Sequence, residues 1–230
     1  MLIRVLSFGV THLNRAFVLY RSTIGKKAIM AVTGLIGFGF VIGHMLGNLQ
    51  VFLGPEAFNA YADLLRRIHG LLWVARLTLL AAVILHIWAA YQLTTTSWVS
   101  RPIGYTDWKP TGSTYASRTM RWSGPILGLF LIYHLLDFTF GKMNPDFIAG
   151  DVYHNVIASF QFWYISAFYI TAMMALGLHL YHGIWSMFQS LGINNPKYNA
   201  LLRRFSALAT VLIVIGFISV PIAVLTRYVS

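Results

Sequence analysis

Four histidines lie well inside long apolar stretches of the chain, where a polar side chain needs a partner. They are His44, His86, His134 and His179, each in a different stretch. Burying a polar group in hydrocarbon costs free energy unless another group meets it. The neutral imidazole nitrogen is also a common ligand of metal ions. These four side chains are therefore candidates for a metal centre inside a membrane.

The apolar stretches themselves are typical of membrane helices. Hydrophobic residues make up 57% of the 230-residue chain and charged residues only 10%, whereas a soluble domain carries about 25% charged residues. Five stretches approach the length of about 20 residues that crosses the hydrocarbon core. A helix satisfies its backbone hydrogen bonds within the segment. The predicted spans are residues 27–52, 71–95, 123–141, 159–188 and 205–226. We expect an all-α integral membrane protein with five transmembrane helices, and residues 1–230 as a single membrane domain.

The basic residues indicate how these spans are oriented. Twelve of the 17 Lys and Arg residues lie before or at the first residue of the first span or in the loops 96–122 and 189–204. Because cytoplasmic segments are enriched in Lys and Arg, we predict a cytoplasmic N-terminus and an outside C-terminus. Residues 1–26 are predicted to form a cytoplasmic or interfacial segment. The net charge of +11 is distributed over the span ends, so we interpret it as a topology signal and expect no nucleic-acid partner.

The positions of the histidines within their spans predict two pairs. At about 1.5 Å per residue, His44 and His134 lie about 3 to 6 Å from the membrane midplane, on its outer side. His86 and His179 lie about 4 to 7 Å on its cytoplasmic side. Two imidazoles at one depth can hold the iron of a planar haem between them. A zinc site would need ligands converging at one depth. We therefore predict two non-covalent b-type haems with these four axial ligands, about 10 Å apart.

An internal similarity supports the span assignment. The stretch TGLIGFGFVIGH, from Thr33 to His44, aligns without gaps with SGPILGLFLIYH, from Ser123 to His134. Both stretches end on a histidine, and both have a glycine ten residues before it. Five identities in twelve apolar residues are weak evidence of duplication, but the shared final histidine places two candidate ligands at equivalent positions.

A second histidine follows in the stretch LHLYHGIWS of the fourth span. His179 matches the depth of His86, so we assign His179 to the iron, and His182 lies one turn nearer the cytoplasm. We interpret His182 either as a contact of a haem propionate or as an interfacial histidine without a ligand. Arg76 and Arg121 are further candidates for propionate contacts, because guanidinium groups pair well with carboxylates.

The predicted ligand set favours electron transfer. Two axial histidines leave the iron no open coordination position, which disfavours oxygen binding and oxygenation. The chain has no cysteine, so it cannot ligate a cubane iron–sulfur cluster or attach a c-type haem. We therefore expect another subunit as one redox partner and a lipid-soluble quinone as the other.

Three motifs carry a resemblance to a known family. They are STIGKKAIMAVTGLIGFGFVIGHMLGNL from Ser22, GPEAFNAYADLL from Gly54, and HLYHGIWSMFQSLGINNPKYN from His179. Over residues 20–226 the chain resembles the cytochrome b subunit of bacterial succinate dehydrogenases and fumarate reductases, in the five-helix dihaem class. The resemblance assigns His44 and His134 to a distal haem, and His86 and His179 to a proximal one.

That resemblance also implies partners and a location. It implies docking of a flavoprotein with covalent FAD and an iron–sulfur protein on the cytoplasmic face of a bacterial inner membrane. Electrons then pass between succinate or fumarate and a quinone, often menaquinone. The family's quinone residues do not transfer cleanly to this chain. By local chemistry, an outer quinone pocket could use Asn48, Glu56, Arg76 or Asp137, and an inner one could lie near Ser22, Lys26 and Trp122.

Other functions stay open at this point. The main hypothesis is the anchor of a succinate:quinone oxidoreductase. The same anchor could serve a quinol:fumarate reductase, or a dihaem cytochrome could serve a hydrogenase or formate dehydrogenase. A transporter with a histidine proton relay is disfavoured, because the sequence predicts neither broken helices nor buried acids along a path.

Overall fold

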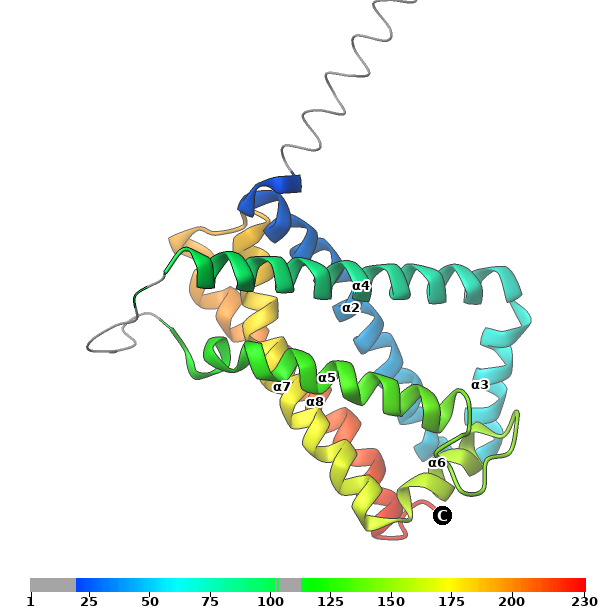
Figure 1. Ribbon diagram of the computed structural model, residues 1–230. Coiled ribbons are helices and arrows are strands. Elements are labelled where there is room, and N and C mark those ends of the chain that lie inside the picture. Colours follow the sequence, from blue (N-terminus) through cyan, green and yellow to red (C-terminus); the bar gives the residue numbers. More distant parts are fainter. Residues whose placement is uncertain (1–19, 102, 104–112) are drawn as a thin grey trace, which may run out of the picture.

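The computed structural model describes residues 20–101, 103 and 113–230, and these residues fold into helices (Figure 1). The elements are α2 (Thr23–Asn48), η1 (Leu49–Leu53), α3 (Pro55–Arg67), α4 (His69–Val99), α5 (Tyr115–Phe138), α6 (Val152–Phe160), α7 (Trp163–Ser190) and α8 (Pro196–Leu225). No β-strand occurs in this described part of the chain, which confirms the all-α prediction. Most of the predicted N-terminal segment 1–26 lies outside the described residues.

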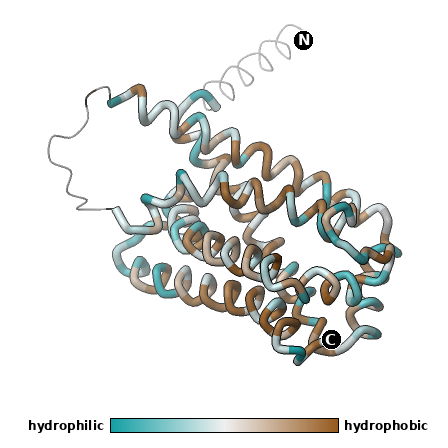
Figure 2. The backbone as a smooth tube through the Cα atoms, turned by 60° about the horizontal axis from the view of Figure 1, so that its bottom comes forward, coloured by the Kyte–Doolittle hydropathy of each residue, from teal (hydrophilic) through white to brown (hydrophobic). Residues whose placement is uncertain are grey.

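Four stretches of the described chain are long and apolar enough to cross a membrane. They are Thr23–Leu53, Gly70–Val99, Trp163–Ser190 and Pro196–Leu225. Their outward faces carry large apolar side chains, and Leu80 and Ile84 of α4 are each 57% exposed. Figure 2 shows these long hydrophobic stretches along the helices, with hydrophilic residues gathered toward their ends. The prediction of a multi-pass membrane protein is confirmed.

The predicted third span coincides largely with α5. This helix begins at Tyr115, before the predicted start at residue 123, and ends at Phe138. It is the least apolar of the long described helices and contains Pro125, and it does not meet the length-and-composition criterion for a span. It packs against α7. A fifth membrane crossing therefore stays a prediction, as does the direction in which the chain crosses.

The predicted fourth span, 159–188, starts too early. Ser159 and Phe160 belong to α6, the chain turns at Gln161 and Phe162, and α7 begins at Trp163. The Ser166 hydroxyl donates to the Phe160 carbonyl oxygen at 2.7 Å, which satisfies an acceptor at the end of α6. No glycine or proline marks this turn, so the continuous apolar pattern concealed it.

Several helices begin where the local sequence provides a cap. Ser22 precedes α2, and its hydroxyl accepts the Gly25 N–H at 2.9 Å. Thr114 caps α5 in the same way, and Asn195 caps α8, where proline follows at the first helical position. Such side chains satisfy backbone donors that have no partner within the helix.

The helices pack around α2 and α7. α7 packs against α8 and α5, and α2 packs against α4, α7 and α8. In Figure 1, α3, α6 and the C-terminus lie at one end of the bundle, which we call the α3–α6 end, and the start of α2 lies at the other, the Ser22 end. One apolar cluster, which includes Val51, Phe58 and Phe160, joins the elements at the α3–α6 end. A second cluster, around Met45 and Ile184, joins α2, α7 and α8.

Candidate functional site

The structure brings the four histidines of the predicted spans together as two pairs. The distal pair is His44 on α2 and His134 on α5, whose ring centroids lie 5.6 Å apart with planes at 85°. The proximal pair is His86 on α4 and His179 on α7, whose centroids lie 6.2 Å apart with planes at 54°. All four side chains are half-buried. The pairs join helices in the combination that their depths predicted.

Three of the four imidazoles have a hydroxyl oxygen near Nδ1. The Nδ1 atom of His86 lies 3.1 Å from Thr33 Oγ1, and that of His179 lies 3.4 Å from Ser123 Oγ. The Nδ1 atom of His134 lies 3.5 Å from the Tyr169 hydroxyl oxygen. A partner on one ring nitrogen orients the ring and leaves the other nitrogen for a metal.

The proton on one of these rings can be assigned from the neighbouring bonds. Thr33 Oγ1 donates its proton to the backbone oxygen of Ile29 at 2.7 Å. The Thr33 oxygen can then only accept from His86, so His86 carries its proton on Nδ1 and keeps Nε2 as a free donor atom for a metal. His44 is oriented differently, since its ring stacks on Phe40 with centroids 5.2 Å apart and planes at 13°.

The internal similarity gains a structural meaning here. Thr33 and Ser123, the first residues of the two similar stretches, each contact a histidine of the proximal pair. The last residues, His44 and His134, form the distal pair. In both helices the two positions are eleven residues apart, about 16 Å along the helix axis. α2 and α5 therefore play equivalent parts in the site. The hydroxyl partners were missed in the sequence analysis, although their shared position in the two stretches was a signal.

The donor set fits haem. Bonds between a metal and imidazole nitrogen are about 2 Å long, so an ion between two imidazoles holds the ring centroids about 6 Å apart, close to both observed separations. No group of three or more His, Cys, Asp or Glu in the described residues could hold a metal ion. Each pair thus offers two protein ligands, which is what haem iron takes beyond its four porphyrin nitrogens and fewer than a zinc site uses.

Small residues leave room beside the histidines. A Cβ atom built at Gly37, Gly39, Gly43, Gly124 or Gly128 would meet no atom within 4 Å, whereas one at Gly34 would lie 3.5 Å from His86 Cε1. Gly39 and Gly43 are exposed on the surface, whereas Gly37, Gly124 and Gly128 are half-buried, and open space at these three positions of α2 and α5 suits a bulky planar ring. Gly177 differs, because its Cβ would lie 2.9 Å from Val214 Cγ2. That glycine serves the close packing of α7 on α8.

The residues predicted to meet propionates have no acidic partner among the described residues. The guanidinium of Arg121 lies over the Trp98 ring at 5.6 Å, and that of Arg76 lies over the Trp73 ring at 5.4 Å. His182 is half-buried on α7, one turn from His179 toward the Ser22 end. Their role toward a propionate stays a prediction.

The residues predicted for the outer and the inner quinone pocket lie toward opposite ends of the bundle. At the α3–α6 end, Asn48 ends α2, Glu56 lies exposed in the first turn of α3, and Asp137 is fully buried. At the Ser22 end, Ser22 caps α2, and Trp122 is 75% exposed on α5. Asp137 is 0% exposed in this packing of the helices, and the role of these residues toward a quinone stays a prediction.

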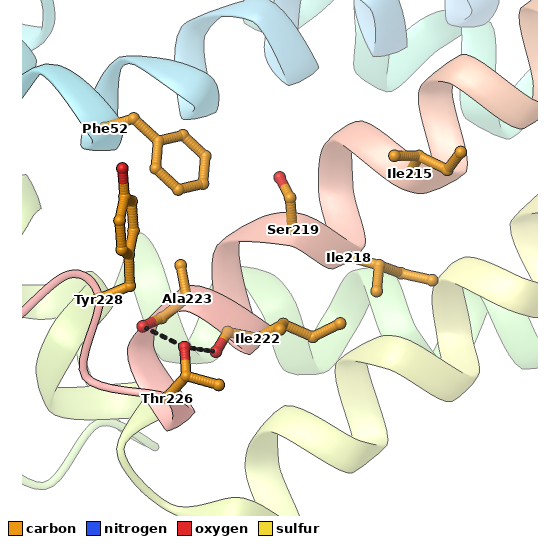
Figure 3. A pocket seen from close by; sticks show the side chains of 8 residues that line it. All are labelled: Phe52, Ile215, Ile218, Ser219, Ile222, Ala223, Thr226 and Tyr228. Carbon is orange, nitrogen blue, oxygen red and sulfur yellow. Dashed lines mark hydrogen bonds between the residues drawn. The ribbon is translucent and has the colours of Figure 1, made fainter.

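An apolar groove of about 600 Å³ opens along α8 at the α3–α6 end instead (Figure 3). Its lining consists of Phe52, Ile215, Ile218, Ser219, Ile222, Ala223, Thr226 and Tyr228. The Ser219 hydroxyl donates to the Gly216 carbonyl oxygen at 2.7 Å, and the Thr226 hydroxyl donates to the Ile222 carbonyl oxygen at 2.9 Å. These two hydroxyls are thus satisfied by carbonyl oxygens of α8, and the Tyr228 hydroxyl is the third polar group of an otherwise apolar lining. The groove has no histidine or charged residue in its lining, so the sequence analysis did not predict it.

Outside the spans, the side chain of Asp151 links α6 to α3 through hydrogen bonds. The Oδ1 atom of Asp151 accepts the His154 N–H and the Asn59 side-chain amide, each at 2.9 Å. These hydrogen bonds to the ionised form hold the pKa of Asp151 below its ordinary value. The Asn59 carbonyl oxygen accepts the Tyr153 N–H at 3.0 Å in return. Asp151 and Asn59 therefore cap α6 jointly at the α3–α6 end.

The fold and this site define a multi-pass helical membrane protein with two histidine pairs between its helices. The family model described as succinate dehydrogenase/fumarate reductase transmembrane subunit matches residues 100–220, more than half of the chain. The chain belongs to this family, and the resemblance seen in its motifs is confirmed. Comparisons with curated proteins and with solved structures give no match. As a family member, the chain is a membrane subunit of an enzyme complex with partner subunits.

Proposed function

We propose that the chain is the dihaem cytochrome b anchor of a succinate:quinone oxidoreductase, passing electrons between the iron–sulfur subunit and a membrane quinone. The observation that carries this proposal is the presence of two histidine pairs, each joining two helices at a separation suited to an iron ion between the rings. Family membership supplies the enzyme class.

The protein's own contribution is to bind and orient the two haems. His44 with His134 would hold one iron and His86 with His179 the other, and each bound haem supplies a site that gains or loses one electron. Thr33 and Ser123 orient the proximal imidazoles through Nδ1. Around His134, the rings of Phe130 and Phe138 lie at 5.7 and 5.5 Å between centroids and keep water from that pair.

The distribution of charge supports docking of the catalytic subunits at the Ser22 end. Basic residues gather there in the first parts of α2, α5 and α8, and Arg101 follows the end of α4, while the acids Glu56, Asp63, Asp146 and Asp151 lie at the α3–α6 end. In a bacterial inner membrane the Ser22 end then faces the cytoplasm. The partners are a flavoprotein with FAD and an iron–sulfur protein.

The natural absence of cysteine allows a direct test of this orientation. Asn194 and Asp146 are both exposed in loops at opposite ends of the bundle. Asn194→Cys should react with a membrane-impermeant thiol reagent only from the cytoplasmic side, and Asp146→Cys only from the outside. The reverse pattern would contradict the proposed orientation.

Haem content tests the proposal most directly. A pyridine haemochrome assay with a reduced-minus-oxidised spectrum on the purified complex should give two b-type haems per chain. One haem would show that one histidine pair is structural. No haem would reject the cytochrome assignment and favour a proton-conducting role for the histidines.

The same family also includes fumarate reductases, so the opposite direction is the second candidate. The purified complex should reduce a quinone with succinate faster than it oxidises a quinol with fumarate. A faster fumarate-driven reaction would assign the chain to a quinol:fumarate reductase. Isolation with an iron–sulfur partner but without covalent flavin would instead favour a hydrogenase or formate dehydrogenase complex.

A further inference from the structure

A fully buried carboxylate lies close to the distal histidine pair. Asp137 on α5 is 0% exposed, as is Ser159 on α6, and Tyr169 on α7 is 5% exposed. An acidic side chain within a membrane helix is costly and is retained where it has a role. Asp137 contacts neither the groove on α8 nor a basic partner among the described residues.

The hydrogen bonds around Asp137 have a definite direction. Its Oδ2 atom accepts from the Ser159 hydroxyl and from the Tyr169 hydroxyl, each at 2.8 Å. Because Tyr169 gives its one hydroxyl proton to Asp137, its oxygen can only accept from His134 Nδ1, which lies 3.5 Å away at the long end of the range. The donors therefore run from His134 through Tyr169 to Asp137.

This chain of donors makes the distal pair different from the proximal pair. The proximal histidines contact the aliphatic hydroxyls of Thr33 and Ser123, and Thr33 passes its proton to a neutral backbone carbonyl. A carboxylate pulls more strongly on a hydroxyl proton than a carbonyl does. The tyrosine oxygen then accepts more strongly from the imidazole, and the imidazole becomes a more basic metal ligand.

We propose that Asp137, acting through Tyr169, is a positioning residue that raises the ligand strength of His134 and lowers the reduction potential of the distal haem relative to a site with a neutral partner. This inference rests on the proposed dihaem function. In its ionised form Asp137 adds a nearby negative charge, and this charge and a more basic ligand both favour ferric over ferrous iron. Both effects therefore act in the same direction.

The primary test is the variant Asp137→Asn in the purified complex. Its amide oxygen can still accept from Ser159 and Tyr169, so the substitution removes the charge while keeping the side-chain shape. A redox titration followed by absorbance and by electron paramagnetic resonance should show the midpoint of one haem raised and the other unchanged. A tenfold change in the ferric-to-ferrous ratio corresponds to about 59 mV for one electron. The variant His134→Ala identifies the distal component, because that component is missing from its spectrum.

Two further variants separate this role from simple packing. Tyr169→Phe should raise the same potential and weaken distal haem binding about 10- to 100-fold. Ser159→Ala should lower the same potential, because Asp137 Oδ2 then accepts from Tyr169 alone. Opposite signs from two neighbouring substitutions are not expected from general loosening of the structure. Ser159→Ala also decides the question if Asp137→Asn fails to assemble.

Tyr133→Phe is the matched control. The Tyr133 ring contacts Tyr169 at 6.0 Å between centroids, but its hydroxyl forms no hydrogen bond within the described residues, so both potentials should stay unchanged. The inference is overturned if Asp137→Asn and Tyr169→Phe leave the distal potential unchanged, if they shift both haems equally, or if Ser159→Ala shows no downward shift. An unmodified complex without haem would reject the proposed function itself, which distinguishes the two failures.

Discussion

The distal histidine pair lies among aromatic rings, whereas the proximal pair is held by aliphatic hydroxyl groups. His134 contacts Phe130, Phe138 and Tyr169, and His44 stacks on Phe40. His86 and His179 instead meet Thr33 and Ser123. Phe138, which contacts His134, also packs against the apolar cluster at the α3–α6 end. Two similar pairs of imidazoles thus have different neighbours.

The difference shows how one helical frame can build two unlike sites. α2 and α5 contribute in the same way to both pairs, a hydroxyl at one level and a histidine eleven residues later. The asymmetry comes from α6 and α7, which add Ser159 and Tyr169 only beside the distal pair. The similar sequences of α2 and α5 therefore determine the spacing of the two sites. The neighbouring helices α6 and α7 determine which hydrogen-bond partners each site has.

The largest expected effect is loss of one haem from either pair. His134→Ala should reduce the haem content from two to one per chain and remove the distal component, and His86→Ala should remove the proximal one, because an iron with one axial imidazole is held weakly. Haem content and reduced-minus-oxidised spectra measure this. The proximal variants should also disturb assembly of the complex, which size-exclusion chromatography reports.

His182→Ala is the control for that experiment. His182 lies on the same helix as His179, but its ring is in neither pair, so the variant should keep both haems. If His182→Ala loses a haem and His179→Ala does not, the assignment of the proximal ligand is wrong.

A smaller effect is expected from the hydroxyl partners of the proximal pair. Thr33→Val removes the oxygen that accepts from His86 Nδ1 while keeping the side-chain shape, and should weaken proximal haem binding about 10-fold. The rate of haem transfer to an excess of an apo haem protein measures this. Thr33→Ser retains the hydroxyl and should behave like the unchanged chain. If Thr33→Val loses haem equally from both sites, the Thr33 hydroxyl does not act on the proximal pair alone.

The smallest effect is expected for Asp151, which caps α6. Because the pKa of Asp151 is lowered in the folded chain, its stabilising effect is present above its unfolded pKa of about 4 and is lost as pH falls through the lower folded value. Asp151→Ala should destabilise α6 by about 1 kcal/mol at neutral pH, seen as faster hydrogen exchange of the α6 amides. The difference from the unchanged chain should disappear in acid. A difference that persists at low pH would contradict this origin.

Matching depth was enough to predict which histidines meet. The rise of a helix is constant, so a residue number within a span converts directly into a level in the membrane. The starting points of α2, α5 and α8 depend on hydrogen bonds that are equally local. Their side-chain acceptors are Ser22, Thr114 and Asn195. The pairing of His44 with His134 and of His86 with His179 could therefore be predicted, while their role as haem ligands stays a prediction.

The predictions for the quinone residues depended on information that depth does not contain. Asn48, Glu56 and Asp137 share a level but face different neighbours, since the rotation of each helix about its axis is set by packing. Asp137 was predicted as a quinone contact and is enclosed by Ser159 and Tyr169. The turn at Gln161 escaped detection for a related reason, because the bond that stabilises it joins Ser166 to Phe160 across the break.

The sequence by itself determined that the chain forms membrane helices, the level of each histidine and the family, because hydropathy, helical rise and motifs are properties of contiguous residues. The tertiary structure alone decided which hydroxyls lie beside His86, His179 and His134, and where the groove on α8 opens. It also decided that Tyr169 connects the buried Asp137 to His134. These features depend on how separate helices rotate and pack against one another, and that arrangement minimises the free energy of the whole bundle rather than of any one segment.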